Sequence, residues 1–492
     1  MKKKRTIDLN TIARMAMEKY GFLPLFPVAV IDEVEAIQEM AFTGNQTDVK
    51  DMRSLLWSSI DNYDSMDLDQ IEYCEHGHNG EIDVKVAIAD VDIYVPKQSR
   101  ADRFAAHNGT SVYTGIVTFP MLPDKLSKGM TSLLPGPDNR AVTVEYSVLP
   151  DGSFRPGNVY QSIVSNKAKL IYEEVGDWLE GTGPMPSAVR EVHGLESQIQ
   201  LQNEASQRLR KKRMERGALD LETLEPQTIM EGGFVKDLVL QKKNLARNLI
   251  EEFMVAANGT IVAHLEKAGI PMIQRVVRIP KNWDGIVMTA ESNHEHLPAR
   301  PDVKALALFL ERQKKTDPEH FPDLSLTIIK LLGPGEYLPL EPGMPPTGHF
   351  SMAVTDYTHS TAPNRRYVDL IIQRLVKSGL AQDRSPYSFE ELANLSAWLS
   401  DREKQSKKVE RFMRKAAAAE LLQDRLGESF DALVTGASAK GTYVRLIAPP
   451  AEGRVMRGER GLFVGQKVRV RLLMTDPSKG FIDFECIGVR RH

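Results

Sequence analysis

Strand-like and helix-like patterns occupy separate parts of this chain, and that separation is the feature that most limits how it can fold. Between residues 58 and 175, alternating and β-branched segments such as EIDVKVAIADVDIYVP (81–96) predict strands. Helical spacing of apolar residues follows at 188–216, 245–269, 367–380 and 388–425. The arrangement predicts an α+β protein.

The N-terminal segment is expected to be a small element of its own. Residues 8–19 have apolar side chains at helical spacing after Asp8, a candidate N-cap. We therefore predict a short helical extension over 1–50 and one large domain over 51–425. Within that domain, the Pro- and Gly-rich segment GPGEYLPLEPGMPPTG (333–348) predicts a loop.

The last part of the chain, 428–492, reads as a separate all-β domain. Short strands alternate there with Gly-containing turns every 8–12 residues, which is typical of a small antiparallel barrel of the OB type. Tyr443 and Arg445 are two residues apart, so on one strand they share a face. A basic and an aromatic side chain on the face of such a barrel predict a platform for single-stranded RNA.

Bulk composition excludes several classes. The net charge of the 492 residues is −3, so any attraction for nucleic acid has to come from local patches or a lined channel. There are two cysteines, Cys74 and Cys486, far apart, which suits a reducing cytoplasm. No apolar run is long enough to span a membrane. Nothing in the sequence indicates an obligate protein partner.

The segment SSIDNYDSMDLDQIEY (58–73) concentrates negative charge. Its five carboxylates are Asp61, Asp64, Asp67, Asp69 and Glu72. In an extended segment Asp67 and Asp69 point the same way, and Asp61 joins them if the intervening residues turn. Converging carboxylates make a site for a hard cation such as Mg²⁺, but their spacing does not fit an EF-hand. Spacing alone does not separate a metal site from a solvated acidic loop.

Seven ordered blocks resemble the RNase II family, the RNB-domain exoribonucleases. The first is the acidic segment itself. The others are VAIADVDIYVP (86–96), SVYTGIVTFPMLPDKLSKGMTSLLPG (111–136), NKAKLIYEEV (166–175), RGALDL (216–221), NLIEEFMVAAN (248–258) and YTHSTAPNRRYVDLIIQRL (357–375). The terminal barrel resembles the S1 domain that follows in this family. The two cold-shock barrels that usually precede the catalytic domain have no counterpart in the first 50 residues.

The resemblance implies a fold and a reaction. The fold is a mixed sheet surrounded by helices, with a central RNA channel. Family members degrade single-stranded RNA processively from the 3′ end, release nucleoside 5′-monophosphates and use Mg²⁺, with Mn²⁺ as a possible substitute. By motif position, Asp61, Asp67 and Asp69 are metal or water ligands, and Asp69 is the one expected to be indispensable. Arg365 matches the arginine that contacts the scissile phosphate, although Arg365 and Arg366 could also be a surface pair at a helix start.

The same resemblance implies residues that bind the RNA. Tyr113 matches an aromatic that stacks on a base near the 3′ end, with core packing as the alternative. Tyr172 and Glu251 match positions that read the ribose 2′-OH, with Glu252 an equally placed rival to Glu251. Arg366 is a further candidate. The basic segment RLRKKRMERG (208–217) either lines the RNA path or forms a solvated helix face.

Gln70 stands where the family has a fourth aspartate. A glutamine can bind Mg²⁺ through its carbonyl oxygen, but one negative charge is lost. The leading hypothesis is an active 3′→5′ exoribonuclease. One alternative is an RNB-fold protein that binds RNA with little or no hydrolysis. Another is a metal-binding scaffold unrelated to RNA, which would leave the basic and aromatic residues unexplained.

Overall fold

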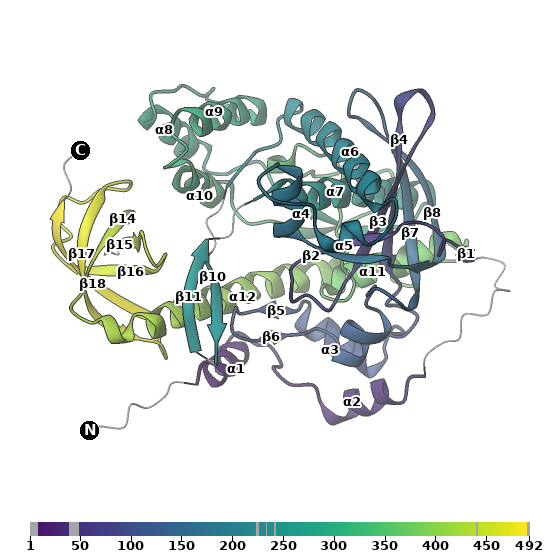
Figure 1. The fold of residues 1–492 in the computed structure, drawn as a ribbon, viewed down its shortest axis with the longest axis horizontal. Helices are drawn as coiled ribbons and strands as arrows, with labels where there is room; N and C mark the ends of the chain where they lie inside the picture. Colours follow the sequence, from purple (N-terminus) through teal and green to yellow (C-terminus); the bar gives the residue numbers. More distant parts are fainter. Residues whose placement is uncertain are drawn as a thin grey trace.

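The computed structural model describes residues 8–38, 49–222, 226–232, 234–240, 243–438 and 441–489. It confirms the α+β class, with a mixed sheet at the centre of the larger part (Figure 1). The sheet strands are β1 (Val49–Asp51), β2 (Ser58–Asp61), β3 (Gln70–His76), β4 (Ile82–Ala89), β7 (Asp138–Val148), β8 (Phe154–Ser165) and β9 (Ala168–Ile171). Their order is β1-β8-β7-β4-β3-β2-β9, parallel at both edge pairs and antiparallel between.

Two long helices cover one face of this sheet. The predicted helix over 188–216 is split into α5 (Ser187–Arg190) and α6 (Leu195–Glu215), with Gly194 at φ 84° between them. Helix α7 (Leu245–Lys267) packs on β7 and β8, and α6 packs on β3. Tyr146 of β7 is fully buried against the ring of Phe253 on α7, with centroids 6.4 Å apart. Apolar faces of both elements thus form the main core.

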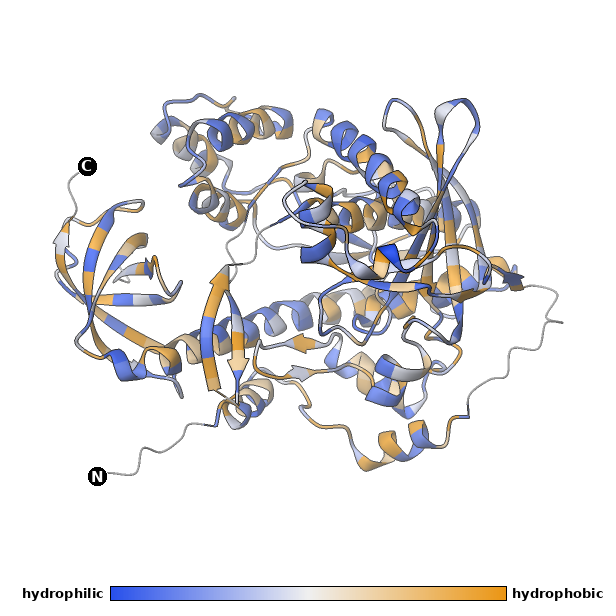
Figure 2. Cartoon of the chain, in the orientation of Figure 1, coloured by the Kyte–Doolittle hydropathy of each residue, from blue (hydrophilic) through white to orange (hydrophobic). Residues whose placement is uncertain are grey.

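Helix α12 (Phe389–Leu421) runs along the molecule toward the barrel, with polar and apolar residues alternating along it (Figures 1 and 2). It contacts α1 (Leu9–Lys19) and the strand pair β12 (Met272–Val276) and β13 (Glu336–Leu340). The prediction of a loop over 333–348 is therefore wrong for 336–340. The remaining elements around the site are α2 (Val28–Glu35), α3 (Arg100–Asn108), β5 (Val112–Tyr113), β6 (Thr118–Phe119), α4 (Tyr172–Leu179), β10 (Pro226–Glu231), β11 (Phe234–Leu240) and α11 (Tyr367–Leu380).

Three further helices form a small unit with a core of its own. They are α8 (Trp283–Ser292), α9 (Val303–Thr316) and α10 (Phe321–Leu332). Their buried side chains include Trp283, Phe309 and Phe321, which form a cluster separate from the main core. In Figure 1 this unit lies between the sheet domain and the barrel.

The C-terminal strands close into a barrel of the OB type. They are β14 (Ser429–Ser438), β15 (Gly441–Leu446), β16 (Glu452–Arg457), β17 (Lys467–Asp476) and β18 (Phe481–Val489). The order is β14-β15-β16-β18-β17, with β16 and β18 parallel. The barrel core also includes Ala418, Ala419 and Leu422 from the end of α12, so the two parts share apolar packing.

The N-terminal extension is helical where it is described. Asp8 caps α1 by accepting a hydrogen bond from the backbone N–H of Asn10, as predicted. Residues 1–7 and 39–48 of the predicted extension lie outside the described residues. In the part of the chain that the structure describes, no helix is both long and apolar enough to cross a membrane.

Candidate active site

Asp69 lies at the start of β3 and is joined to the motif that precedes α11. Its side chain is only 3% exposed. Oδ1 accepts a hydrogen bond from the backbone N–H of Asn364 at 2.8 Å, and Oδ2 lies 3.2 Å from Nε of Arg365. The fold thus brings two distant motifs into direct contact, with a buried carboxylate facing a cation that is 43% exposed.

Burial makes ionisation of the carboxyl groups at this site unfavourable. Burial raises the pKa of Asp69 to about 7, although the Arg365 guanidinium partly offsets that rise. Burial also raises the pKa of Asp67, and the nearby charge of Asp61 adds to the effect. Such carboxylates gain from any positive charge that binds between them.

The raised pKa of Asp69 predicts how the free energy of unfolding depends on pH when EDTA removes metal ions. A carboxyl group whose pKa is raised from 3.8 to about 7 keeps its proton longer in the folded than in the unfolded chain. Because the group ionises in the unfolded chain first, stability is lost as the pH rises from 4 to 7, at about 1.4 kcal/mol for each unit of raised pKa. Urea unfolding at pH 5 and pH 8 should show a larger loss for wild type than for Asp69→Asn, which keeps only the loss from other buried acids such as Asp90. An equal loss in both proteins would contradict the burial argument.

Asp61 and Asp67 are each held by a local hydrogen bond. Asp61 ends β2, and its Oδ1 accepts from Ser65 Oγ at 2.8 Å. Tyr113 Oη donates to Asp67 Oδ2 at 3.3 Å. Among the described residues, no three His, Cys, Asp or Glu side chains form a ready-made metal centre. The donor set consists of oxygen atoms alone, however, and this chemistry fits a hard cation such as Mg²⁺.

The side chain of Gln70 points away from the side chain of Asp69. The carbonyl of Asp69 accepts the N–H of Ala89 at 2.9 Å, so Asp69 continues the ladder in which Gln70 pairs with Ile88. Successive side chains on a strand alternate between faces. Gln70 therefore shares a face with Glu72, and Asp69 points to the other face.

Tyr113 lies at the mouth of a cavity next to the carboxylates. It is 43% exposed, so the alternative that it packs in the core is wrong. The backbone N–H of Ser111 donates to the carbonyl of Arg365 at 2.9 Å, which holds the two segments together. A cavity of about 200 Å³ opens beside Tyr113 and Arg365, with Tyr337 and His359 in its wall.

Tyr113→Ala should lengthen the final product of RNA digestion and weaken binding of short RNA. Stacking on an aromatic ring is worth about 1–3 kcal/mol per base, so the loss should be roughly tenfold or more. Tyr113→Phe keeps the ring and loses only the hydrogen bond to Asp67, so it is the matched control. Gel analysis of end products should show longer ends in the Ala variant only; identical ends in all three proteins would exclude stacking on Tyr113.

Arg366 differs from its neighbour. Its Nη2 lies 2.7 Å from Oδ1 of Asp369, whose side chain is fully buried. The same oxygen accepts the backbone N–H of Ala362 at 2.8 Å. Arg366 therefore neutralises a buried carboxylate at the start of α11, whereas Arg365 points to the carboxylates of the site.

Tyr172 lies near the acidic site at the start of α4. The Arg247 guanidinium sits 4.3 Å from the centre of its ring. Burial and the charges of Asp61 and Glu72 raise the pKa of its hydroxyl. A neutral hydroxyl among charged groups fits the predicted contact with a ribose.

Glu251 and Glu252 have different surroundings. Glu252 is 2% exposed and binds Arg213 of α6 through both oxygens, at 2.9 and 2.6 Å. Glu251 pairs with Arg213 and Lys243, both at 2.6 Å, and its side chain is 35% exposed. Glu251 is thus the one open to a ligand. Arg213, from the basic segment 208–217, stabilises both carboxylates.

Two functional candidates escaped the sequence analysis. His359 lies within the quoted motif YTHSTAPNRRY, and its Nδ1 is 2.9 Å from Oη of Tyr337. Burial and the charge of Arg366 lower its pKa well below the usual range, so the ring is neutral. The two rings meet edge to face, with centroids 5.7 Å apart, and both residues line the cavity that Tyr113 also lines.

The barrel faces the three-helix unit. Tyr443 is 38% exposed on the outer face of β15, and Arg445 shares that face. Arg445 Nη2 lies 2.7 Å from Oδ1 of Asp323 on α10, with both side chains largely buried. A second ion pair, 2.8 Å between Lys467 on β17 and Glu319 just before α10, also joins the barrel to this unit. The predicted RNA platform is therefore partly engaged by Asp323 of α10.

Paired variants decide what Arg445 does. If RNA phosphate competes with Asp323 for Arg445, Arg445→Ala should weaken binding of long RNA and Asp323→Ala should strengthen it, each by a few-fold. If the pair only holds the barrel, both variants should change affinity in the same direction. Fluorescence anisotropy at one fixed salt concentration measures this. Glu319→Ala, at the more exposed pair, is the control.

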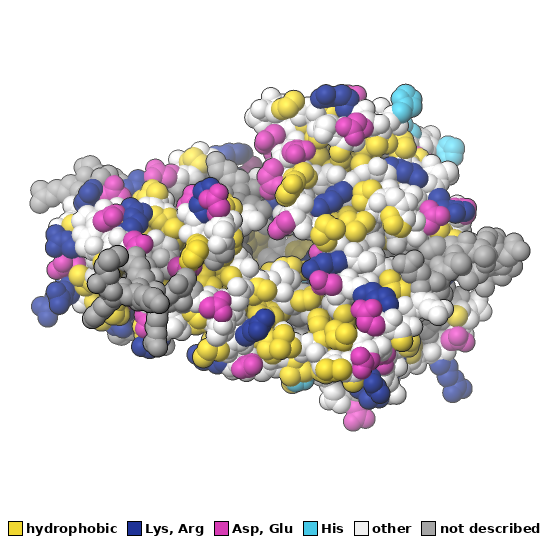
Figure 3. Space-filling model, turned by 60° about the horizontal axis from the view of Figure 1, so that its bottom comes forward, with side chains coloured by type: hydrophobic (Ala, Val, Ile, Leu, Met, Phe, Trp, Pro, Cys, Tyr) yellow, Lys and Arg dark blue, Asp and Glu magenta, His cyan; other side chains and the backbone are white. Residues whose placement is uncertain are grey.

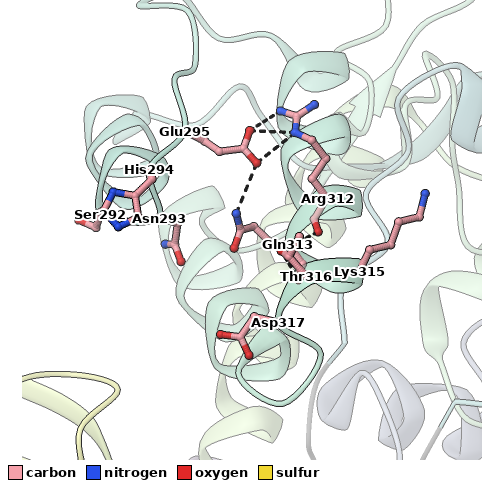
Figure 4. A pocket seen from close by; sticks show the side chains of 9 residues that line it. All are labelled: Ser292, Asn293, His294, Glu295, Arg312, Gln313, Lys315, Thr316 and Asp317. Carbon is pink, nitrogen blue, oxygen red and sulfur yellow. Dashed lines mark hydrogen bonds and ion pairs between the residues drawn. The ribbon is translucent and has the colours of Figure 1, made fainter. Parts of the chain in front are cut away.

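Other surface features lie away from these residues. A larger depression of about 660 Å³ lies between α8 and α9, where Arg312 pairs with Glu295 (Figure 4). None of the predicted site residues lines it. On the face shown in Figure 3, basic and acidic side chains are interspersed, as expected from the small net charge.

Comparison with known proteins gives the class. Residues 49–382 match the model of the RNB domain, and residues 428–486 match that of the RNase II-type exonuclease C-terminal S1 domain. The first match covers well over half of the chain. The protein therefore belongs to the RNB-domain family, as the sequence motifs predicted.

Relatives and solved structures agree with this assignment. Ribonuclease R of Thermotoga maritima is 30% identical over 93% of this chain and 68% of its own length. Ribonuclease R 1 of Lactococcus lactis is 27% identical over 94% of this chain, which spans only 59% of that relative. The apo form of Mycoplasma genitalium RNase R has the same fold, with a TM-score of 0.87 and 22% identity over 98% of this chain and 78% of that chain.

Proposed function

We propose that this protein is a divalent-metal-dependent 3′→5′ exoribonuclease that acts processively on single-stranded RNA and releases nucleoside 5′-monophosphates. The observation that carries the proposal is the contact between buried Asp69 and exposed Arg365 beside Tyr113. The similarity to proteins named ribonuclease R supports the same reaction. A structure of Mycoplasma genitalium RNase R in complex with ribose-methylated single-stranded RNA, with a TM-score of 0.87 and 21% identity over 98% of this chain and 78% of that chain, shares the fold.

Each residue has a part that its surroundings favour. Asp61, Asp67 and Asp69 would hold Mg²⁺, or Mn²⁺, which when bound activates water and stabilises the leaving 3′-oxygen. Arg365 presents a planar, permanently charged group to the scissile phosphate, and its charge offsets the charge that the phosphate gains. The N–H of Asn364 fixes the direction of the Asp69 carboxylate.

RNA selectivity would come from the walls around this centre. Tyr113, which is 43% exposed in this cavity, offers a flat surface on which bases of any sequence can stack. The hydroxyl of Tyr172 and the carboxylate of Glu251 can bind a ribose 2′-OH, which DNA lacks. Tyr443 on the barrel would bind RNA before it enters.

A labelled poly(A) oligonucleotide tests the proposal. With Mg²⁺ we expect AMP and a short end product with few intermediates of other lengths; we expect no products with EDTA and none from a poly(dA) control. A 3′-phosphorylated poly(A) distinguishes attack at the 3′ end from internal cleavage. Internal cleavage, or cleavage that EDTA leaves intact, would contradict the proposal.

Gln70 supports one other function, an RNA-binding protein with little hydrolysis. The fold does not distinguish hydrolysis from RNA binding alone, because yeast Ssd1, a pseudonuclease, also shares it. The TM-score with Ssd1 is 0.72, with 16% identity over 94% of this chain and 58% of that chain. If wild type is inert at all Mg²⁺ and Mn²⁺ concentrations while Gln70→Asp hydrolyses RNA, the binding function holds. We expect wild type to be active and Gln70→Asp to need less Mg²⁺.

A further inference from the structure

Glu72 is a buried carboxylate that lacks a partner. Its side chain is 0% exposed, and neither Oε1 nor Oε2 makes a hydrogen bond with any residue that the structure describes. Buried charged groups in proteins are almost always paired, hydrogen-bonded or bound to a metal. Burial raises the pKa of Glu72 well above its usual range, so this carboxyl group is either protonated or neutralised by a cation that binds to it.

The atoms around Glu72 are also acceptors. Ser58 is its direct cross-strand partner on β2, so the two side chains share a face and lie close together. Gln202 of α6 donates through Nε2 to the backbone carbonyl of Glu72 at 3.4 Å. Ser58 Oγ and Gln202 Oε1 are both buried, and neither has a partner among the described residues. One proton on Glu72 would serve one of these oxygens, whereas a cation can bind several.

The position of Glu72 relates it to the altered residue of the family motif. Gln70 and Glu72 are two residues apart on β3, so they lie on the same face. Gln70 offers a carbonyl oxygen but no charge. A carboxylate next along this face restores that charge.

We propose that Glu72 is the anionic ligand of a divalent cation on the Gln70 face of β3, in place of the carboxylate that Gln70 does not provide. The proposal rests on the proposed function, because it adds a second cation, on the Gln70 face of β3, to the one that Asp61, Asp67 and Asp69 would hold. It makes Glu72 part of the acidic segment that binds metal, although neither the spacing nor the family motif points to it.

Metal binding without RNA tests the proposal. EDTA-treated full-length protein is titrated with Mg²⁺ and with Mn²⁺ in a calorimeter. Glu72→Gln should lose one bound ion or bind it at least about tenfold more weakly. Glu75→Gln is the matched control on the same strand, since Glu75 is more exposed and pairs with Lys85. Equal binding by wild type and Glu72→Gln would show that Glu72 is only a protonated buried acid.

Moving the charge gives a second test. Gln70→Asp combined with Glu72→Gln should regain the lost affinity, because the carboxylate returns to the same face two residues away. Failure to regain it would overturn the charge argument. In EDTA, Glu72→Gln should melt at the same or a higher temperature than wild type, since it removes an unpartnered charge. A variant that does not fold in EDTA would show that the carboxylate has a partner within the protein, against the proposal.

The RNA assay separates this inference from the proposed function. If wild type binds metal through Glu72 but leaves RNA intact, the inference stands and the hydrolytic function fails. If wild type degrades RNA and Glu72→Gln binds metal normally, the function stands and the inference fails.

Discussion

Asp69→Asn should bind single-stranded RNA nearly as tightly as wild type but hydrolyse it about a thousandfold more slowly. The amide keeps an oxygen that can accept the N–H of Asn364, so the loop before α11 should stay in place. It loses the negative charge that faces Arg365 and that would hold the metal. Charge stabilisation of this kind is worth several kcal/mol at the transition state, and each 1.4 kcal/mol is a factor of about ten in rate.

Single-turnover hydrolysis with excess enzyme measures this effect without interference from product release. Asp64→Asn is the matched control, because Asp64 belongs to the same acidic run but is exposed. Its rate should stay within a few-fold of wild type. If Asp69→Asn and Asp64→Asn were equally active, the buried carboxylate would have no part in the reaction. If Asp69→Asn lost RNA binding as well, its role would be structural.

The sequence predicted the members of the site better than their directions. Ordered motifs placed Asp69 and Arg365 in one site, and the structure puts them 3.2 Å apart. The same motif position grouped Gln70 with the aspartates, yet strand alternation sends adjacent side chains to opposite faces. The same alternation that puts Asp67 and Asp69 on one face puts Gln70 on the opposite face. What the sequence could not show is that Glu72 is completely buried, because burial depends on how α6 packs on β3.

Long-range pairing explains the other differences. The segment 336–340 contains Pro339, is flanked by Pro334 and Pro342 and reads as a loop, but it pairs with β12, 60 to 68 residues earlier. From the sequence, Arg445 was expected to bind RNA, but in the structure it forms an ion pair with Asp323 on α10. Local periodicity determines α11 and α12 well, because their apolar residues follow the helical repeat. Contacts between distant segments leave no such local pattern.

Replacing Arg365 should lower the rate of hydrolysis, whereas replacing the adjacent Arg366 should lower the stability of the fold. Arg365→Lys should lower the rate of RNA hydrolysis by about a hundredfold while leaving the melting temperature almost unchanged. The side chain is 43% exposed, and lysine cannot present two parallel N–H groups to a phosphate. Arg366→Ala should instead destabilise the fold by about 3 kcal/mol, because it leaves the buried carboxylate of Asp369 without its cation.

Measuring both stability and the rate of hydrolysis for both variants distinguishes a catalytic role from a structural one. Thermal unfolding in EDTA reports stability, and single-turnover hydrolysis at saturating RNA reports the chemical step. Arg366→Ala that still folds at low temperature should retain most of its rate, since its contacts run to Asp369 and α11 rather than to Asp69. A large rate loss in Arg366→Ala with no loss of stability would reverse the two roles. An unchanged rate in Arg365→Lys would mean that a point charge suffices at the phosphate, and that the planar fork of the guanidinium is not what the site uses.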